Sequence, residues 1–261
     1  MADLQRALRD GHYAKTQIYS RARLIAWSHR RRFETAVDLA KGFGGKRLLD
    51  YGCGDGTFLG LLMATPFAPA LAVGVETHQA IVDDCRRRYE GEPRLGFVLP
   101  RDLDGADHRG RYDAVFCMEV LEHVVALEPI LDRFESLLAR DGRLVVSVPV
   151  ETGLPLIVKQ LVRRVAGWRG IGHYPGTTSY RAGELAASVL AGRVQHVVRP
   201  VFDCGDGPFH DHKGFNWMAV KDLIGRRFEI ERSIASPFCW LGPHLASQVW
   251  FVARRKATTA R

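Results

Sequence analysis

Short apolar segments alternate with segments of helical periodicity through the middle of the chain, from Lys46 to Pro149. Five segments have compact apolar or β-branched centres, which is typical of strands buried on both faces of a sheet: KRLLDY, ALAVGVE, RLGFVL, YDAVFCM and RLVVSVP. The segments between them place apolar residues about every 3.6 positions, as amphipathic helices do: TFLGLLMAT, HQAIVDDCRRRYE and VVALEPILDRFESLLAR. Strands that alternate with helices predict an α/β fold with a doubly wound, mostly parallel sheet.

The pattern changes on both sides of this central part. Upstream, residues 18–43 have helical periodicity and lead into a glycine-rich turn, which predicts one or two helices before the first strand. Downstream, residues 155–168 and 181–192 are helical in pattern, and residues 194–202 are strand-like. Near the end, Asn216 is expected to cap a further helix, and RFEIERSIA and SQVWFVARR alternate like two strands that pair antiparallel.

Composition and charge limit the class of protein. The chain has 261 residues, of which 46% are hydrophobic and 25% charged, and this excludes a disordered or collagen-like protein. The net charge is +8, and residues 1–47 hold 11 basic against four acidic side chains. A basic N-terminal arm can meet RNA, an anionic membrane or an anionic substrate, or it can be the solvated face of Arg-rich helices.

Cysteine usage and the N-terminal segment indicate a compartment. The five cysteines are scattered and form no Cys-x-x-Cys pair, which favours a reducing environment and argues against a cysteine zinc site. The first residues are polar, unlike a signal peptide, and no apolar run reaches the roughly 18 residues that a membrane span needs. We therefore expect a cytoplasmic protein, and leave open a peripheral location at the inner face of the membrane.

The most informative segment is LLDYGCGDGTFL, residues 48–59. A predicted strand ends near Asp50, and Gly52, Gly54 and Gly56 precede the next helix. Glycines allow a sharp turn and let a ligand lie against bare backbone. Loops of this kind occur in nucleotide, flavin and other cofactor sites, so the loop alone predicts a cofactor without specifying which one.

Acidic residues around the loop narrow the choice of cofactor. A dinucleotide would place its pyrophosphate on the helix N-terminus, where a protein carboxylate repels it, yet Asp50 and Asp55 flank the glycines. These carboxylates suit a ligand that carries an ammonium and a sulfonium group. Glu76 closes the second strand and can accept hydrogen bonds from both ribose hydroxyls. The combination favours S-adenosylmethionine over NAD.

With these motifs the chain resembles the class I S-adenosylmethionine-dependent methyltransferases, over about residues 46–150 and the C-terminal strands. The resemblance implies that the methionine part of the cofactor lies at the glycine loop and above the end of the fourth strand. It also implies that the ribose meets the second strand and that the adenine lies after the third. The residues at these positions are Asp50, Gly52, Cys53, Gly54, Glu76, Asp102, Leu103, Met118 and Glu119.

The family also implies a seven-stranded sheet whose last strand is antiparallel, in agreement with the two C-terminal strand patterns. We accordingly expect four parts: an N-terminal helical arm or lid (1–45), the cofactor-binding core (46–150), an insertion after the fifth strand that acts as an acceptor lid (151–211), and a C-terminal helix and strands that complete the sheet (212–261).

Three candidate catalytic residues follow the fourth strand. Glu119, Glu122 and His123 have the spacing Glu-x-x-Glu-His, which would place them on one helical face at the carboxyl edge of the sheet. Methyl transfer is an in-line displacement, and a hydroxyl acceptor benefits from a base or a metal. We therefore expect His123 and Glu122 to act in catalysis. Far along the chain, His212 lies in a segment rich in His and Asp, and such side chains can hold Mg, Mn or Zn.

Two subfamilies have a similar Glu-x-x-Glu-His pattern. In ubiquinone-biosynthesis O-methyltransferases it is associated with a divalent cation. In small-RNA 2′-O-methyltransferases the two acids and the His bind metal with a later His, and the segment from Asp211 to Trp217 resembles theirs with one extra glycine. This resemblance implies a metal set of Glu119, Glu122, His123 and His212. Metal-free enzymes of the fold carry the same pattern, with the His as a base.

The insertion contains an amphipathic segment, residues 155–168. Its apolar residues share one face (Leu156, Ile157, Leu161, Val162 and Val165), and its polar residues share the other (Lys159, Gln160, Arg163 and Arg164). A basic amphipathic helix either lies on an anionic membrane or closes as a lid on its own domain. The ubiquinone-type enzymes carry a comparable insertion that docks on membrane.

The leading functional hypothesis is an S-adenosylmethionine-dependent methyltransferase that methylates a hydroxyl of a small-molecule, lipid-linked or sugar acceptor. RNA 2′-O-methylation is the alternative, which the basic arm favours and the lack of a recognisable RNA-binding module disfavours. A non-catalytic S-adenosylmethionine-binding protein is the third hypothesis. The glycine loop together with Glu119, Glu122 and His123 argues against it.

Overall fold

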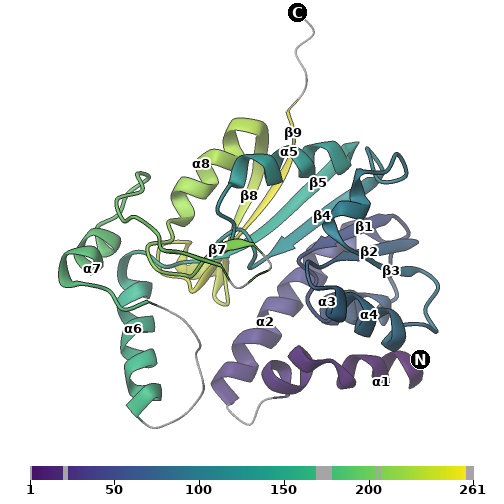
Figure 1. Cartoon of the computed structure of the whole chain (residues 1–261), viewed down its shortest axis with the longest axis horizontal. Helices are drawn as coiled ribbons and strands as arrows, with labels where there is room; N and C mark the ends of the chain where they lie inside the picture. Colours follow the sequence, from purple (N-terminus) through teal and green to yellow (C-terminus); the bar gives the residue numbers. More distant parts are fainter. Residues whose placement is uncertain (1, 20–22, 169–177, 204, 206, 257–261) are drawn as a thin grey trace, which may run out of the picture. The chain divides into compact units, whose positions relative to one another are not determined.

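Figure 1 shows the computed structural model, which describes residues 2–19, 23–168, 178–203, 205 and 207–256. The chain forms two compact units, which are described separately. The first unit comprises Met1–Met118 and Asp132–Val146, and the second comprises Glu119–Leu131 and Ser147–Arg261. Part of the predicted acceptor lid, residues 169–177, lies outside the described residues.

The main sheet has seven strands in the order β3-β2-β1-β4-β5-β9-β8. These strands are β1 (Arg47–Tyr51), β2 (Leu71–Val75), β3 (Leu95–Val98), β4 (Tyr112–Met118), β5 (Leu138–Pro149), β8 (Phe228–Ser236) and β9 (Gln248–Arg255). β1 pairs in parallel with β2 and β4, and β2 with β3, whereas β8 and β9 pair antiparallel. The predicted α/β fold, with a mostly parallel seven-stranded sheet and an antiparallel last strand, is confirmed.

Helices precede the sheet and connect its strands. The α-helices are α1 (Ala2–Asp10), α2 (Arg23–Ala40), α3 (Thr57–Met63), α4 (Gln79–Arg88), α5 (Leu127–Leu137), α6 (Gly153–Trp168), α7 (Ala182–Val189) and α8 (Trp217–Arg227). Shorter turns are the π-helical η1 (Ala14–Ile18) and the 3₁₀-helical η2 (Lys41–Phe43), η3 (Pro100–Asp104) and η4 (Cys239–Leu241). A separate antiparallel ribbon consists of β6 (Val201–Asp203) and β7 (Pro208–His210).

In the first unit, the strands are apolar along their length because both faces of the sheet are covered. Consecutive residues of β1, Leu48 and Leu49, are both fully buried although they point to opposite faces. Phe58 of α3 packs on Phe116 of β4 with ring centroids 5.0 Å apart, and each such buried side chain contributes about 1.5–3 kcal/mol. α1 and α2 both contact α3 (Figure 1), and α3 begins directly after the glycine loop.

In the second unit, β9 is the buried strand of the C-terminal pair. Trp250 and Phe251 are fully buried in it, whereas much of β8 is exposed, as expected for the edge strand of the sheet. Asn216 caps α8, because its Oδ1 accepts the backbone N–H of Met218 at 3.0 Å. The predicted helix cap is therefore confirmed.

The strand predicted at 194–202 is mostly wrong. Only Val201 and Phe202 enter a strand, β6, which continues to Asp203. Val194 and Val198 are 63% and 91% exposed, whereas Val197 is buried, so the apolar residues before β6 do not share one face of a strand. Pro200 also lacks the N–H that a continuous ladder requires.

The structure gives the orientation of the amphipathic helix, which the sequence left open between a membrane-facing helix and a lid. In α6, Leu156 is buried, but Ile157, Leu161 and Val162 are exposed. Lys159 and Arg163 turn inward, whereas Arg164 is exposed. Lys159 and Arg163 contact the buried carboxylate of Glu151 at 2.9 and 3.2 Å. A buried carboxylate is costly unless it is paired, and this requirement outweighs the exposure of the aliphatic face.

No helix within the described part of the chain combines the length and the hydropathy that crossing a bilayer requires.

Replacing the cap residue tests the local anchor of α8. Asn216 also donates through Nδ2 to the carbonyls of Gly192 and Val194, at 2.9 and 3.1 Å. We expect Asn216→Ala to lower the free energy of unfolding by about 1–3 kcal/mol, since a cap and two partly buried hydrogen bonds are lost. Urea unfolding measures this loss. Asn216→Asp keeps the cap acceptor and should lose less; equal losses for the two variants would contradict the assigned cap.

Candidate functional site

The glycine loop turns because its glycines adopt backbone angles that other residues avoid. Gly52, Gly54 and Gly56 have φ values of 80°, 53° and 73°, all in the left-handed region. A Cβ atom on Gly56 would also lie 2.9 Å from the ring of Phe97. The three glycines are therefore required by conformation, and Gly56 also by packing.

Among the described acidic residues of the first unit, Asp50 has the most strongly shifted pKa. It lies in β1, is 1% exposed, and neither carboxylate oxygen has a hydrogen-bond partner among the described residues. Burial, and then the negative charge of Glu76, raise the pKa of Asp50 to about 8. A buried carboxylate without a partner needs a proton or a cationic ligand, so Asp50 is poised to receive positive charge.

Glu76 follows β2 and is tied to the loop. Its Oε2 accepts the backbone N–H of Gly54 at 3.1 Å, and its Oε1 accepts the N–H of Thr77 at 2.7 Å. An ionised carboxylate can accept about four hydrogen bonds. Oε1 also accepts the Thr77 hydroxyl at 2.9 Å and the N–H of His78 at 3.5 Å, so Oε1 is fully used. Oε2 accepts one bond in the described part of the chain, and its second lone pair can accept a further donor, such as a ribose hydroxyl.

A small cleft opens at the glycine loop. This glycine-loop cleft has a volume of about 90 Å³. Five of the predicted cofactor residues line it: Asp50, Gly52, Cys53, Gly54 and Met118. Cys53 is buried, and burial raises the pKa of its thiol well above the ordinary value, so it is an uncharged part of the wall.

Three predicted cofactor residues of the first unit are not among the lining residues of the cleft. They are Glu76, Asp102 and Leu103. Asp102 and Leu103 lie in η3, where Asp102 Oδ2 accepts the N–H of Leu99 at 2.9 Å and Leu103 is buried. These two positions follow β3, where the resemblance to the methyltransferase family expects the adenine.

The N-terminal segment contributes cleft residues that sequence reasoning missed. Tyr13, Arg32 and Phe33 line the glycine-loop cleft. Arg32 donates to the Tyr13 hydroxyl at 3.1 Å, and the backbone N–H of Tyr13 donates to Asp55 Oδ2 at 2.7 Å. The only sequence feature that pointed to these residues was the excess of basic residues at 1–47. This excess did not distinguish Arg32 from the neighbouring arginines.

In the second unit, the Glu-x-x-Glu-His residues lie in a turn rather than in the expected helix. Residues 121–123 form this turn, and α5 begins only at Leu127. Glu119 has φ of 55°, an unfavourable conformation for a residue with a Cβ. Its Oε1 accepts from Gln248 Nε2 at 2.6 Å and from Ser147 Oγ at 3.3 Å, so Glu119 is tied to β9 and β5.

Glu122, His123 and His212 form a compact group, here called the Glu-His-His cluster. One ligand atom from each lies within 4.8 Å of the others. Glu122 is fully buried, and its Oε1 lies 4.0 Å from His123 Nε2. The rings of His123 and His212 are 4.9 Å apart and perpendicular. The fourth predicted metal residue, Glu119, is not part of this group.

Hydrogen bonding fixes the tautomer of His123. Its Nδ1 lies 2.8 Å from the backbone oxygen of His210, which can only accept, so Nδ1 carries the proton. In the neutral ring Nε2 is then a lone-pair acceptor. The N–H of His210 also donates to the carbonyl of His123 at 3.0 Å. This reciprocal pair holds the ring in one orientation, which suits a base or a metal ligand.

His212 is kept neutral by its surroundings. Burial lowers its pKa to about 4, against the opposing effect of Glu151. Its Nδ1 is buried and has no hydrogen-bond partner among the described residues. A neutral imidazole at neutral pH can coordinate a cation or accept a proton.

Arg199 joins the two chain segments that carry the cluster. Its guanidinium donates to the carbonyl of Glu122 and, at 2.7 Å, to the carbonyl of Asp211. It also lies over the ring of Phe215, 5.2 Å from the centroid. Because one side chain bonds both segments, Arg199 helps to position Glu122 near His212.

A family model described as a methyltransferase domain matches residues 20–188. This range is more than half of the chain, so the chain belongs to the methyltransferase domain family. With its sheet order and glycine loop, the protein is a class I S-adenosylmethionine-dependent methyltransferase by fold, and S-adenosylmethionine is the cofactor of that class.

Individual proteins are similar to the chain over part or all of its length. The ubiquinone biosynthesis O-methyltransferase of Bradyrhizobium diazoefficiens is 32% identical over 119 residues, 45% of this chain and 45% of that protein. The chain therefore matches about half the length of this curated relative.

Solved structures share the fold at low identity. The PH0226 protein of Pyrococcus horikoshii has a TM-score of 0.56 and 17% identity, over 87% of this chain and 91% of that one. Geranyl diphosphate methyltransferase, solved with S-adenosylmethionine, has a TM-score of 0.54 and 16% identity, over 96% and 94%. These similarities concern the fold alone.

The protonation of Asp50 gives a testable pH dependence. Between about pH 4 and pH 8 the folded protein keeps a proton on Asp50 that the unfolded chain releases. The free energy of unfolding should therefore fall as the pH rises through this window. Asp50→Asn removes this titration, so its stability should depend less on pH in urea unfolding. The exposed Asp38→Asn is the control, and it should keep the wild-type slope. Equal slopes for wild type and Asp50→Asn would contradict the assignment.

Proposed function

We propose that the protein transfers the methyl group of S-adenosylmethionine to a hydroxyl group of a small acceptor. The observation that carries this proposal is the pair of prepared groups. One is the buried Asp50 carboxylate at the glycine loop, and the other is His123 with its Nε2 fixed as an acceptor. The O-methyltransferase name of the Bradyrhizobium relative supports oxygen as the methylated atom.

The residues of the glycine-loop cleft match the charges of the donor. Its methionine part carries an ammonium and a carboxylate, and the cleft offers both the Asp50 carboxylate and the Arg32 guanidinium. Glu76 takes the ribose hydroxyls, and Asp102 and Leu103 lie beside the adenine. Tyr13, Arg32 and Phe33 make the N-terminal segment a lid over this cleft. A cationic ligand would also remove the cost of ionising Asp50.

When bound, S-adenosylmethionine would supply an electrophilic methyl group, and the C–S bond that breaks would release S-adenosylhomocysteine as a neutral thioether. His123 accepts the proton of the acceptor hydroxyl at Nε2 as the oxygen attacks, and its Nδ1–H remains bonded to His210. Glu122 stabilises the imidazolium that forms, since its carboxylate lies 4.0 Å from Nε2. Base catalysis of this kind contributes about 10²–10⁴-fold.

The Glu-His-His cluster also fits a divalent cation. The set of one carboxylate and two imidazoles is an ordinary donor set for such ions. The unpartnered Nδ1 of His212 and its low pKa favour coordination. A cation held by Glu122, His123 and His212 would lower the pKa of a coordinated hydroxyl. His123 would then be a ligand instead of the base.

Replacing His123 tests the proposal. We expect His123→Ala to lower methyl transfer at least about 100-fold, while S-adenosylhomocysteine binding, measured by calorimetry, stays within a few-fold. His196→Ala, an exposed histidine, is the control and should be fully active. Acceptors to test are phenols, catechols, sugars and RNA 2′-hydroxyls. Full activity of His123→Ala, or product binding without transfer to any hydroxyl, would overturn the proposal.

Chelation separates the two roles of His123. Turnover that survives dialysis against EDTA assigns His123 as the base. Turnover that disappears and returns with Mg²⁺ or Mn²⁺ assigns the cluster to a cation. Transfer to RNA alone, with steep salt dependence, would replace the small acceptor by an RNA.

The outward face of α6 supports peripheral contact with a membrane, and hence a lipid-linked acceptor. Leu154, Ile157, Val158, Leu161 and Val162 are each at least 45% exposed. The inward basic residues are already paired with Glu151, so the contact is apolar rather than electrostatic.

Vesicle co-sedimentation tests this contact. We expect binding to anionic vesicles that persists at high salt, because aliphatic side chains make the contact. Ile157→Ser with Leu161→Ser should abolish it, whereas Val198→Ser, an exposed site outside α6, should not. No co-sedimentation at low salt would remove the membrane from the proposal.

A further inference from the structure

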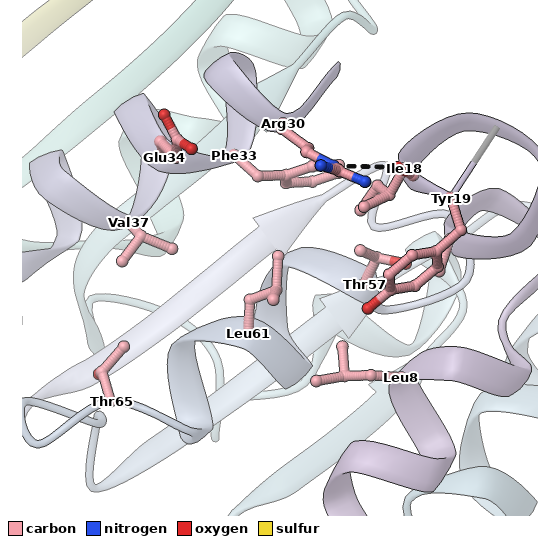
Figure 2. Close-up of a pocket in the computed structure, with 11 residues that line it drawn as sticks. Leu8, Ile18, Tyr19, Arg30, Phe33, Glu34, Val37, Thr57, Leu61 and Thr65 are labelled. Atoms are coloured by element: carbon pink, nitrogen blue, oxygen red, sulfur yellow. Dashed lines mark hydrogen bonds between the residues drawn. The ribbon is translucent and has the colours of Figure 1, made fainter. Parts of the chain in front are cut away.

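A second cavity lies among the N-terminal helices of the first unit. This N-terminal pocket has a volume of about 340 Å³, within the range of small-molecule sites. Its wall is mainly apolar, with side chains from α1, η1, α2 and α3: Leu8, Ala14, Ile18, Phe33, Val37 and Leu61. Figure 2 shows Leu61 between Val37 and Thr65 on one side and Ile18, Tyr19 and Arg30 on the other.

Residues from α2 and from the segment that begins with α3 line the pocket at regular spacing. Arg30, Phe33 and Val37 follow one stripe of α2, and Leu61 and Thr65 follow Thr57 at successive fourth positions. At 1.5 Å per residue, seven residues of helix extend roughly 10 Å. A wall of this length and composition suits an extended apolar molecule.

Of the polar side chains that line the pocket, Arg30 is the one that can bind an anionic ligand group. Glu34 is neutralised by Arg31 at 2.6 Å. The hydroxyls of Thr57 and Thr65 donate to Asp55 Oδ1 and to the carbonyl of Leu62. Arg30 donates through Nε to the carbonyl of Ile18 at 3.0 Å (Figure 2). Its two terminal nitrogens have no acceptor among the described residues, and such a guanidinium favours a carboxylate.

The pocket shares its wall with the glycine-loop cleft. Phe33 and Thr57 line both cavities. Asp55 connects the same parts through hydrogen bonds, because it accepts from Thr57 and from the backbone N–H of Tyr13, directly before η1. A molecule in the pocket would therefore brace η1 and α2 against α3, the elements that border the cofactor cleft.

We propose that the N-terminal pocket binds an aliphatic carboxylate of medium chain length, and that this ligand and the methyl donor strengthen each other's binding. The chain lies along Leu61 and Phe33, and the carboxylate pairs with Arg30. This inference concerns binding and does not depend on which acceptor is methylated.

Calorimetry with decanoate tests the site directly. We expect saturable binding of decanoate to the full chain and clearly weaker binding of decan-1-ol, because only the acid pairs with Arg30. Leu61→Trp fills the cavity and should abolish binding. Arg30→Gln should weaken decanoate binding at least about tenfold but leave decan-1-ol unchanged. Arg9→Gln, which removes the same charge from α1 outside the pocket wall, should bind like wild type.

Linkage to the cofactor is measured with S-adenosylhomocysteine. We expect saturating decanoate to tighten its binding about fivefold or more, a modest coupling between two sites, and Leu61→Trp to lose this effect. Leu61→Trp is shown to be folded if it still binds S-adenosylhomocysteine. If it does not bind, Val37→Phe is used as the cavity-filling variant instead.

Three results would overturn the site: no binding of decanoate, equal binding of decanoate and decan-1-ol, or unaltered decanoate binding by the cavity-filling variants. Binding without any effect on S-adenosylhomocysteine would overturn the coupling. A protein that binds decanoate but transfers no methyl group would contradict only the proposed function.

Discussion

The cofactor site of the first unit depends on one buried acidic group, the carboxyl of Asp50. It is buried in β1 without a partner, and a folded protein tolerates this only where a ligand or a proton can compensate. The left-handed glycines turn the chain directly after it, and the positively charged Arg32 lines the same cleft. A ligand that pairs with Asp50 should therefore raise the free energy of unfolding of the protein.

The second unit solves a different problem, the orientation of an imidazole. His123 could rotate freely in an open turn, but the paired backbone contacts with His210 and the bridge between Val124 and Phe209 fix it. Arg199 then links the Glu122 turn to the Asp211 segment. Backbone carbonyls do most of this positioning, which explains why few of these contacts are visible as side-chain motifs.

The sequence predicted what local periodicity and backbone chemistry determine. The buried strands, the glycine loop and the Asn216 cap follow from short-range rules, and the structure has them. It did not predict the turn at Glu119–His123, because spacing alone cannot distinguish a helical face from a turn. It also missed Tyr13 and Arg32, because their positions depend on contacts between distant parts of the chain: α2 packs on α3, and Tyr13 bonds to Asp55. The inward position of Lys159 and Arg163 in α6 has the same origin, because it depends on the buried carboxylate of Glu151 and not on the pattern of the helix.

The pairing of Glu151 with Lys159 and Arg163 has a consequence for variation of the insertion. Burial alone would raise the pKa of Glu151, but the two cations lower it below its ordinary value, so the attachment stays ionised well into the acidic range. The ion pairs of Lys159 and Arg163 with Glu151 hold α6 in place. The aliphatic side chains on its outer face take no part in these ion pairs. Substitutions on that surface can therefore accumulate, and retune what the helix touches, without releasing it from the protein.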